Sequence, residues 1–215
     1  MERLKQQVAE AALEHLDDVT TLGVGTGSTM TYFIQALSRI KHRIDGCVAS
    51  SIATEQQLRA AGLPVITLAV ADPLALYVDG ADEVTSHRSM IKGGGGALTR
   101  EKIVANAASK FLCLVDESKL VRRLGAFPVA VEVIPMARSL VARALVKLGG
   151  DPIYREGFVT DNGNYILDVH SLNLDEPMAM EERIQLIPGV VDNGIFAKRP
   201  ADNVLIARAH GVEIF

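Results

Sequence analysis

Short apolar runs alternate with amphipathic helical stretches along the first half of the chain, and this alternation most restricts the folds it can adopt. Runs typical of buried strands lie at 21–25, 46–49, 65–68, 75–79 and 111–115. Between them, apolar residues recur at helical intervals over 4–16, 28–40, 53–61 and 99–108. Apolar strands that alternate with helices predict an α/β fold, in which a mostly parallel sheet is covered by helices on both faces.

The pattern changes after Phe127. Its elements are a strand, a helix, a hairpin with an Asp-Asn-Gly turn, a helix and a strand, at 129–134, 136–148, 161–163, 176–186 and 190–197. This β-α-β-β-α-β order is that of a ferredoxin-like α+β unit. We therefore expect a smaller lobe at 128–200. The core would comprise 1–127 plus 201–215, since the strand-like tail can return to the first sheet.

The composition is that of an ordinary globular chain. Of 215 residues, 48% are hydrophobic and 22% are charged, which excludes a disordered or low-complexity chain. The 22 basic and 26 acidic residues give a net charge of −4, and scattered Lys and Arg do not indicate a nucleic-acid partner. No apolar run approaches the ~18 residues of a membrane span, and the polar start at 2–7 argues against a signal peptide.

Cysteines and histidines give no sign of a disulfide or a metal site. Cys47 and Cys113 both lie in apolar runs, so we interpret them as buried thiols in a reducing compartment. The five histidines are far apart and lack metal-ligand spacing. We therefore expect a cytoplasmic protein that needs no metal or other cofactor and has no membrane partner.

A glycine-rich turn, Gly25-Thr26-Gly27-Ser28-Thr29, joins the first expected strand to a helix. Glycines allow close backbone approach, and the helix N-terminus offers free N–H groups and a positive dipole end. These features suit a phosphate. They do not match a dinucleotide fingerprint, which needs glycine at position 28. The alternative is a plain turn with a hydroxyl cap on the helix.

Three further segments follow expected strands, where open α/β sheets place their ligands. Asp79-Gly80-Ala81-Asp82-Glu83 has three carboxylates in five residues, and two close carboxylates can divide acid and base work; the alternative is a solvated turn. Lys92-Gly93-Gly94-Gly95 offers a cation and amides for a developing oxyanion, or else a flexible linker. Glu101 opens a helix and is a candidate general base, although the helix dipole alone favours a carboxylate there. Lys119 follows the strand at 111–115.

At these residues the sequence resembles the type A ribose-5-phosphate isomerases, and the resemblance runs essentially from end to end. The matching segments lie at 25–29, 79–82, 92–95, 97–102, 115–119, 127–135, 159–164 and 187–191. Several long motifs in the same order are more specific than any one glycine loop. Gly96 stands where some members of the family have alanine.

The resemblance implies a Rossmann-like core with a ferredoxin-like lobe, usually as a homodimer or a dimer of dimers. It implies cofactor-free interconversion of D-ribose 5-phosphate and D-ribulose 5-phosphate in the non-oxidative pentose phosphate pathway. Glu101 would be the proton acceptor. The substrate would be bound by residues 26–29, 79–82, 92–95 and Lys119, and more loosely by Lys5, which lies where the family has a phosphate-contacting lysine.

The chemistry fits these residue types. Isomerisation moves a proton between neighbouring carbons through an enediolate, so a single carboxylate, Glu101, can take it from C2 and return it to C1. Lys92 and the glycine amides suit the oxyanion of that intermediate. Asp79 and Asp82 would move oxygen-bound protons and open the sugar ring. The phosphate would anchor the substrate at Ser28 and Thr29 and orient it.

Two other classes of function fit a similar fold. One is a sugar-phosphate-sensing effector domain of a transcription regulator, but the residues before position 21 are too few for a helix-turn-helix. The other is a related enzyme, such as an amino-sugar phosphate deaminase or an acyl-CoA transferase whose carboxylate attacks a thioester. The combination of Asp79, Asp82, Lys92 and Glu101 favours the isomerase.

Overall fold

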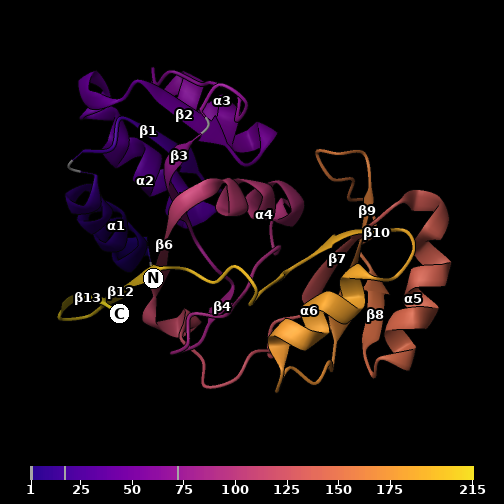
Figure 1. The fold of residues 1–215 in the computed structure, drawn as a ribbon. Helices are drawn as coiled ribbons and strands as arrows, with labels where there is room; N and C mark the ends of the chain where they lie inside the picture. The colour runs from indigo at the N-terminus through magenta and orange to yellow at the C-terminus, as the bar shows by residue number, and fades with distance from the viewer. Residues whose placement is uncertain (1, 17, 72) are drawn as a thin grey trace. The chain divides into compact units, whose positions relative to one another are not determined.

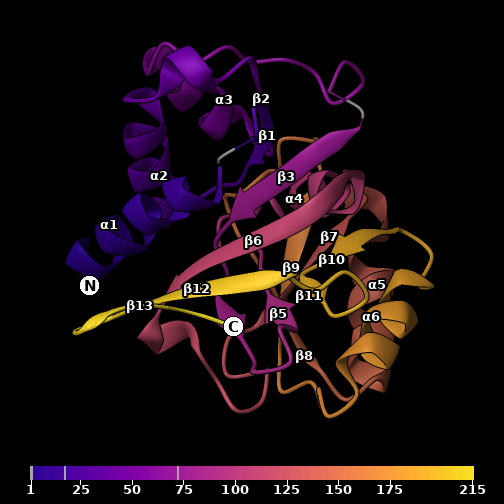
Figure 2. The same ribbon diagram turned by 60° about the vertical axis from the view of Figure 1, so that its left-hand side comes forward.

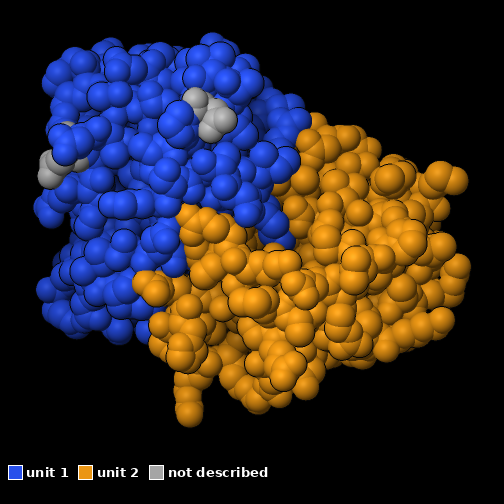
Figure 3. Space-filling view, viewed as in Figure 1, with its two compact units in different colours: residues 1–81, 100–120, 201–215 blue, residues 82–99, 121–200 orange. Residues whose placement is uncertain are grey.

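A computed structural model describes residues 2–16, 18–71 and 73–215. The contacts of the chain divide it into two compact units, coloured separately in Figure 3. Unit 1 comprises residues 1–81, 100–120 and 201–215, and unit 2 comprises residues 82–99 and 121–200. The domains expected from the sequence differ from this division at 82–99 and 121–127, which belong to unit 2.

Unit 1 is built on a six-stranded sheet of order β13-β12-β6-β3-β1-β2 (Figure 1). Its strands are β1 (Thr21–Val24), β2 (Gly46–Ala49), β3 (Leu74–Asp79), β6 (Ala108–Asp116), β12 (Asn203–Arg208) and β13 (Gly211–Ile214). Neighbouring strands are parallel except for β12 and β13. The structure therefore confirms the mostly parallel sheet and the return of the C-terminal strands to it.

Helices cover both faces of this sheet: α1 (Glu2–Ala11), α2 (Ser28–Ser38), α3 (Ile52–Ala60) and α4 (Leu98–Ala107). Leu22 and Val24 of β1 belong to the buried core that includes Val8 of α1 and Phe33 of α2. Gly23 between them faces the other way, because a Cβ on it would lie 2.6 Å from Val104 of α4. Figure 2 shows α1 and α2 on one side of the strands and α4 on the other.

Unit 2 contains an antiparallel four-stranded sheet of order β10-β7-β9-β8. Its elements are β7 (Val129–Val133), α5 (Arg138–Lys147), β8 (Asp151–Tyr154), β9 (Tyr165–His170), α6 (Pro177–Gln185) and β10 (Val190–Asn193). Both helices contribute to the core of this unit, among others through Val141 and Ile184. The order of elements and strands confirms the ferredoxin-like lobe.

Three very short strands form a second sheet in unit 2 that the sequence did not predict. They are β4 (Glu83–Val84), β5 (Met90–Ile91) and β11 (Ile195–Phe196), in the order β11-β5-β4. The single strand expected at 190–197 is thus divided at Gly194, whose N–H donates to Ala130 O and whose carbonyl accepts from Lys92 N. Through this sheet, residues 82–99 are paired with another segment of unit 2.

The strand expected at 65–68 is not formed. Val65 makes an isolated bridge to Cys47, so the segment lies beside β2 without extending the sheet. The remaining short 3-10 helices are at Ala12–His15, Lys41–Arg43, Glu117–Lys119 and Pro135–Ala137. Within 2–16, 18–71 and 73–215, no helix combines the length and apolar character needed to cross a membrane.

Candidate functional site

The turn after β1 and the end of β3 meet in unit 1. The backbone N–H of Thr26 donates to Oδ1 of Asp79 at 3.0 Å. Because β1 and β3 are parallel neighbours, both segments leave the sheet at the same edge. A Cβ on Gly25 would lie 1.8 Å from the same oxygen, so this approach requires glycine. The structure therefore brings Thr26 and Asp79 together.

Asp79 is fully buried and held by further donors. The Tyr77 hydroxyl donates to Oδ2 at 2.5 Å, and the Gly80 N–H donates to Oδ1 at 2.7 Å. Tyr77 lies two residues earlier on β3, so its side chain projects on the same face of the strand as Asp79. The Asp79 carboxylate is thus fixed in orientation by groups from two strand ends.

Tyr77 also connects Asp79 with Glu101. Burial raises the pKa of the Tyr77 hydroxyl well above its ordinary value, and the charges of Asp79 and Glu101 raise this pKa further. The Tyr77 hydroxyl is bonded to Asp79, and the charge of Glu101 reaches it electrostatically. Glu101 lies in the first turn of α4 and is 4% exposed. Sequence analysis did not select Tyr77, although its two-residue spacing from Asp79 in an apolar strand was the available signal.

Hydroxyl groups gather around the side chain of Thr26. Its Oγ1 lies 3.0 Å from Ser50 Oγ, 2.8 Å from Ser51 Oγ and 3.1 Å from Thr54 Oγ1. The Thr54 hydroxyl in turn donates to Gly25 O at 2.8 Å, and Ser51 caps α3. Sequence analysis also missed these partners, which hold the glycine-rich turn from the end of β2 and the start of α3.

The start of α2 has the features of an anion-binding helix terminus. Gly27 precedes the helix with φ of +118°, a conformation that glycine adopts readily. The 11-residue helix begins with Ser28, which is exposed, and Thr29, which is half-buried. Their hydroxyls and the first backbone N–H groups therefore lie at the positive end of the helix dipole.

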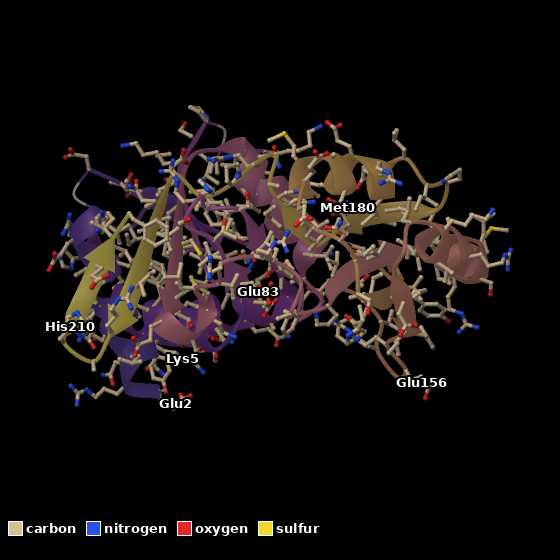
Figure 4. All side chains as sticks on the ribbon, turned by 90° about the horizontal axis from the view of Figure 1, so that it is seen from below. Glu2, Lys5, Glu83, Glu156, Met180 and His210 are labelled. Atoms are coloured by element: carbon tan, nitrogen blue, oxygen red, sulfur yellow. The ribbon has the colours of Figure 1, made fainter. Side chains whose placement is uncertain are left out.

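The two lysines predicted to bind substrate in unit 1, Lys119 and Lys5, lie outside the turn after β1 and the end of β3. Lys119 ends a 3-10 helix that begins after β6, where the Asp116 side chain accepts from Ser118 N at 2.9 Å. Lys5 lies on α1, and its ammonium forms an ion pair with Glu2 at 3.0 Å. Figure 4 labels both residues of this pair.

Asp82 and the glycine loop at 92–95 form a second group, in unit 2. The Gly94 N–H donates to Asp82 Oδ2 at 2.8 Å, and Asp82 N donates to Ile91 O at 2.8 Å. A Cβ on Gly94 would lie 2.8 Å from Asp82 Oδ1, so glycine is needed for this approach. The loop is therefore folded against the Asp82 carboxylate.

Lys92 is only 3% exposed. Its backbone N–H donates to Gly194 O at 2.9 Å, and its ammonium lies 5.5 Å from the centre of the Phe196 ring. Burial of a lysine against an aromatic face restricts the directions in which its charge can act. Both contacts come from the segment around β11, which sequence analysis assigned to one continuous strand.

The predicted residues thus form two groups along the chain. Unit 1 contains residues 26–29, 79–81, Glu101, Lys119 and Lys5, and unit 2 contains Asp82 and residues 92–95. The chain passes directly from Ala81 to Asp82 and from Thr99 to Arg100. Among the residues that the structure describes, no group of three His, Cys, Asp or Glu is arranged to hold a metal ion.

Comparison with known proteins gives matches over most or nearly all of the chain. A family model described as ribose 5-phosphate isomerase A (phosphoriboisomerase A) matches residues 46–211. Ribose-5-phosphate isomerase A of Legionella pneumophila (strain Corby) is 65% identical over 212 residues, which cover 99% of this chain and 98% of the relative.

Solved structures agree with these matches. The crystal structure of ribose 5-phosphate isomerase A from Neisseria gonorrhoeae aligns with a TM-score of 0.97 at 46% identity, covering 100% of this chain and 96% of that one. A D-ribose-5-phosphate isomerase in complex with phospho-erythronic acid aligns with a TM-score of 0.95 at 37% identity, covering 100% of this chain and 98% of that one.

Proposed function

This chain belongs to the ribose 5-phosphate isomerase A family, and we propose that it interconverts D-ribose 5-phosphate and D-ribulose 5-phosphate with Glu101 as the base. The observation that carries the proposal is the 65% identity to a curated isomerase over 99% of the chain. The whole-chain likeness to solved isomerases supports it. The reaction belongs to the non-oxidative pentose phosphate pathway.

Glu101 carries the proton in this proposal. Its carboxylate removes the proton from C2 of the open-chain aldose, which gives an enediolate, and returns the proton to C1 of that enediolate, which gives the ketose. One base suffices because both carbons are adjacent and present the same face. Support comes from the placement of Glu101 at the start of α4, where it acts on the same phenol as Asp79.

Lys92 and the amides of the glycine loop stabilise the oxyanion of the enediolate in this scheme. A buried cation and fixed N–H groups favour negative charge that develops only in the transition state. Asp79 and Asp82 move protons at the sugar oxygens and open the ring. Asp79 is positioned by Thr26 and Tyr77, and Asp82 by Gly94.

The phosphate group binds at the start of α2. Gly27, Ser28 and Thr29 supply N–H and hydroxyl donors there, Thr26 holds the turn against Asp79 beside the substrate, and Gly80 and Ala81 line the substrate. Lys119 and Lys5 add positive charge for the phosphate. These interactions lie far from the reacting carbons, so they orient the substrate in the ground state as well as in the transition state.

A direct assay with a single conservative variant tests the proposal. The purified wild-type protein should convert ribose 5-phosphate into ribulose 5-phosphate in the presence of EDTA. Glu101→Gln keeps the size of the side chain and removes the base, so kcat should fall by about 10³-fold or more with KM little changed. Near-wild-type turnover by this variant would exclude Glu101 as the base.

A Ser28→Ala, Thr29→Ala double variant serves as the complementary test. It should mainly raise KM, because its donors bind the phosphate equally in the ground state and the transition state. An unchanged KM would remove the phosphate assignment at α2, while leaving the role of Glu101 to be judged from the first variant.

We also propose that the enzyme is a cytoplasmic homodimer. The resemblance to the family supports dimerisation, and large apolar side chains such as Met136 (93% exposed) and Leu186 (81% exposed) are available on unit 2 for burial. Both cysteines are buried and reduced, which suits a reducing compartment. Sedimentation equilibrium should give twice the chain mass of 23.1 kDa, and a monomer at assay concentrations would contradict the dimer.

A further inference from the structure

The glycine loop is supported by side chains outside it. Residues 93–96 are four consecutive glycines, and each can adopt positive or negative φ at little cost. Gly93 and Gly96 have φ of +109° and +77° in the folded chain. Peptide groups between such residues can flip, and a flip would turn an N–H group away from the oxyanion. Within the loop, Gly96 N donates to Gly93 O at 2.9 Å, and side chains outside the loop supply further bonds that favour one orientation.

Arg155 is one such side chain, and nothing in the proposed mechanism uses it. Its Nη2 donates to Gly93 O and its Nη1 donates to Gly94 O, both at 3.2 Å. The guanidinium therefore binds two successive carbonyl groups of the loop. Arg155 directly follows β8 and lies about sixty residues from the loop along the chain.

Fixing a carbonyl also fixes the next amide. In a trans peptide the C=O and the following N–H point in opposite directions within one plane. With Gly93 O held by Arg155, the Gly94 N–H must point away from the guanidinium, and it donates to Asp82 at 2.8 Å. With Gly94 O held in the same way, the Gly95 N–H also points away from Arg155. Together with Asp82 and the bond from Gly96 N to Gly93 O, Arg155 thus holds the direction of two amides in the proposed oxyanion loop.

The guanidinium is itself anchored on a strand pair. Asp168 of β9 accepts from Arg155 Nε at 2.8 Å and from Nη2 at 2.5 Å. The backbone N–H of Arg155 donates to Ile166 O at 3.0 Å, which extends the pairing of β8 and β9 by one bond. The Arg155 side chain is 18% exposed and that of Asp168 is 20% exposed. An ion pair that is partly buried and joined by two hydrogen bonds is more rigid than a surface ion pair.

An aromatic side chain completes the support. The ring centre of Phe158 lies 5.3 Å from Cζ of Arg155. A Cβ on Gly96 would lie 2.2 Å from the same ring, so Phe158 packs directly on the end of the glycine loop. The hairpin segment that carries Arg155 and Phe158 therefore contacts the loop at Gly93, Gly94 and Gly96.

We propose that Arg155, held by Asp168, is a positioning residue for isomerisation: it prevents peptide flips in the glycine loop and so keeps the amides of Gly94 and Gly95 directed at Asp82 and the enediolate. This inference rests on the proposed function. Arg155 acts through the loop and does not touch the substrate. Its loss should therefore affect the transition state, in which the oxyanion develops, more than the bound substrate.

The test compares Arg155→Ala with a matched control in the same unit. Arg155→Ala should lower kcat by about 10- to 100-fold and change KM by less than about threefold, because an oxyanion contact is lost while the phosphate contacts remain. Arg123→Ala removes an arginine that pairs with Asp175 at an exposed site, and it should leave kcat unchanged. Thermal unfolding of each variant reports on stability separately.

Chemical rescue separates positioning from a general structural role. Free guanidinium, added well below the concentrations that unfold the wild-type protein, should restore part of kcat in Arg155→Ala and have no such effect on Arg123→Ala. Arg155→Lys should remain slow, because an ammonium cannot bind two carbonyls and a carboxylate in one plane. Asp168→Asn should also lower kcat, as Arg155→Ala does.

The outcomes are distinct. Folded Arg155→Ala with wild-type kcat, or with a loss that appears only in KM or in thermal stability, would overturn the inference. Should Arg155→Ala fail to fold, wild-type kcat in both Arg155→Lys and Asp168→Asn would overturn it equally. Absence of isomerase activity in the wild-type protein would instead refute the proposed function.

Discussion

The position of the Asp79 carboxylate depends on three neighbouring hydrogen-bond donors. Its carboxylate accepts from Thr26 N, Gly80 N and the Tyr77 hydroxyl. Because burial and two nearby carboxylates raise the pKa of Tyr77, its phenol stays protonated at neutral pH and acts as a donor. We infer that Tyr77 holds Asp79 in the geometry needed for proton transfer at the sugar oxygens.

Tyr77→Phe removes this donor and leaves the ring in place. We expect kcat to fall about tenfold, since a hydrogen bond to a charged group contributes about 1.5–3 kcal/mol and two donors to Asp79 remain. Steady-state kinetics with ribose 5-phosphate measures the effect. Tyr32→Phe is the control, because the Tyr32 hydroxyl donates to the carboxylate of Glu2 away from Asp79. Equal kcat in Tyr77→Phe and Tyr32→Phe would contradict the prediction.

Among the elements, the turn after β1 depends on close backbone approach to the end of β3. Gly25→Ala would place a methyl group 1.8 Å from Asp79 Oδ1, so the carboxylate must move and give up its present contacts. We expect kcat to fall by about 100-fold or more, within the range for loss of an acid–base group. Kinetics of the folded variant at 25 °C would show this.

Gly46→Ala provides the comparison for Gly25→Ala. Its methyl group would lie 2.4 Å from Cδ1 of Ile66, so it also overpacks unit 1, but against a flexible apolar side chain. Both variants should lose about 1–3 kcal/mol of stability, and only Gly25→Ala should lose activity. A similar kcat in the two variants would show that crowding of Asp79 is not the cause.

The elements that the sequence predicted correctly are those with long repeating patterns. Both the parallel sheet and the β-α-β-β-α-β lobe follow from apolar runs and helical spacing over many residues. The strands β4 and β5 were not predicted, because two residues are too few to show an alternating pattern of apolar and polar side chains. Val65–Leu68 has strand composition but pairs at one position, since sheet membership depends on neighbours that the local pattern does not include.

The same limit applies to the candidate site. Glycine loops, paired carboxylates and Glu101 were visible because each is a local departure from the expected pattern. Tyr77 and Arg155 were not, because a tyrosine in an apolar strand and an arginine beside a hairpin are ordinary in sequence. Their significance depends on long-range contacts: the Arg155 guanidinium bonds to Gly94 across 61 positions of the chain.

For the whole molecule, the order of the chain explains why both units supply proposed site residues. Unit 1 is made of three segments and unit 2 of two. The two carboxylates Asp79 and Asp82 are three residues apart, yet they belong to different units, as do Lys92 and Glu101. The residues proposed for the reaction therefore come from both units, with Glu101 on α4 in unit 1 and the glycine loop in unit 2.

The route of the transferred hydrogen distinguishes proton transfer through a base from a direct hydride shift. A base that removes the C2 proton as an acid–base step exposes that proton to exchange, whereas a direct hydride shift between carbons does not. In deuterium oxide with EDTA present, the wild-type enzyme should incorporate deuterium from solvent into the sugar phosphate during turnover. Incorporation can be partial, because Glu101 is only 4% exposed and the proton can return before it exchanges. Nuclear magnetic resonance at C1 and C2 measures it over many reversible turnovers, in which even slow exchange accumulates. A complete absence of deuterium after such prolonged turnover would favour hydride transfer and remove Glu101 from its proposed role.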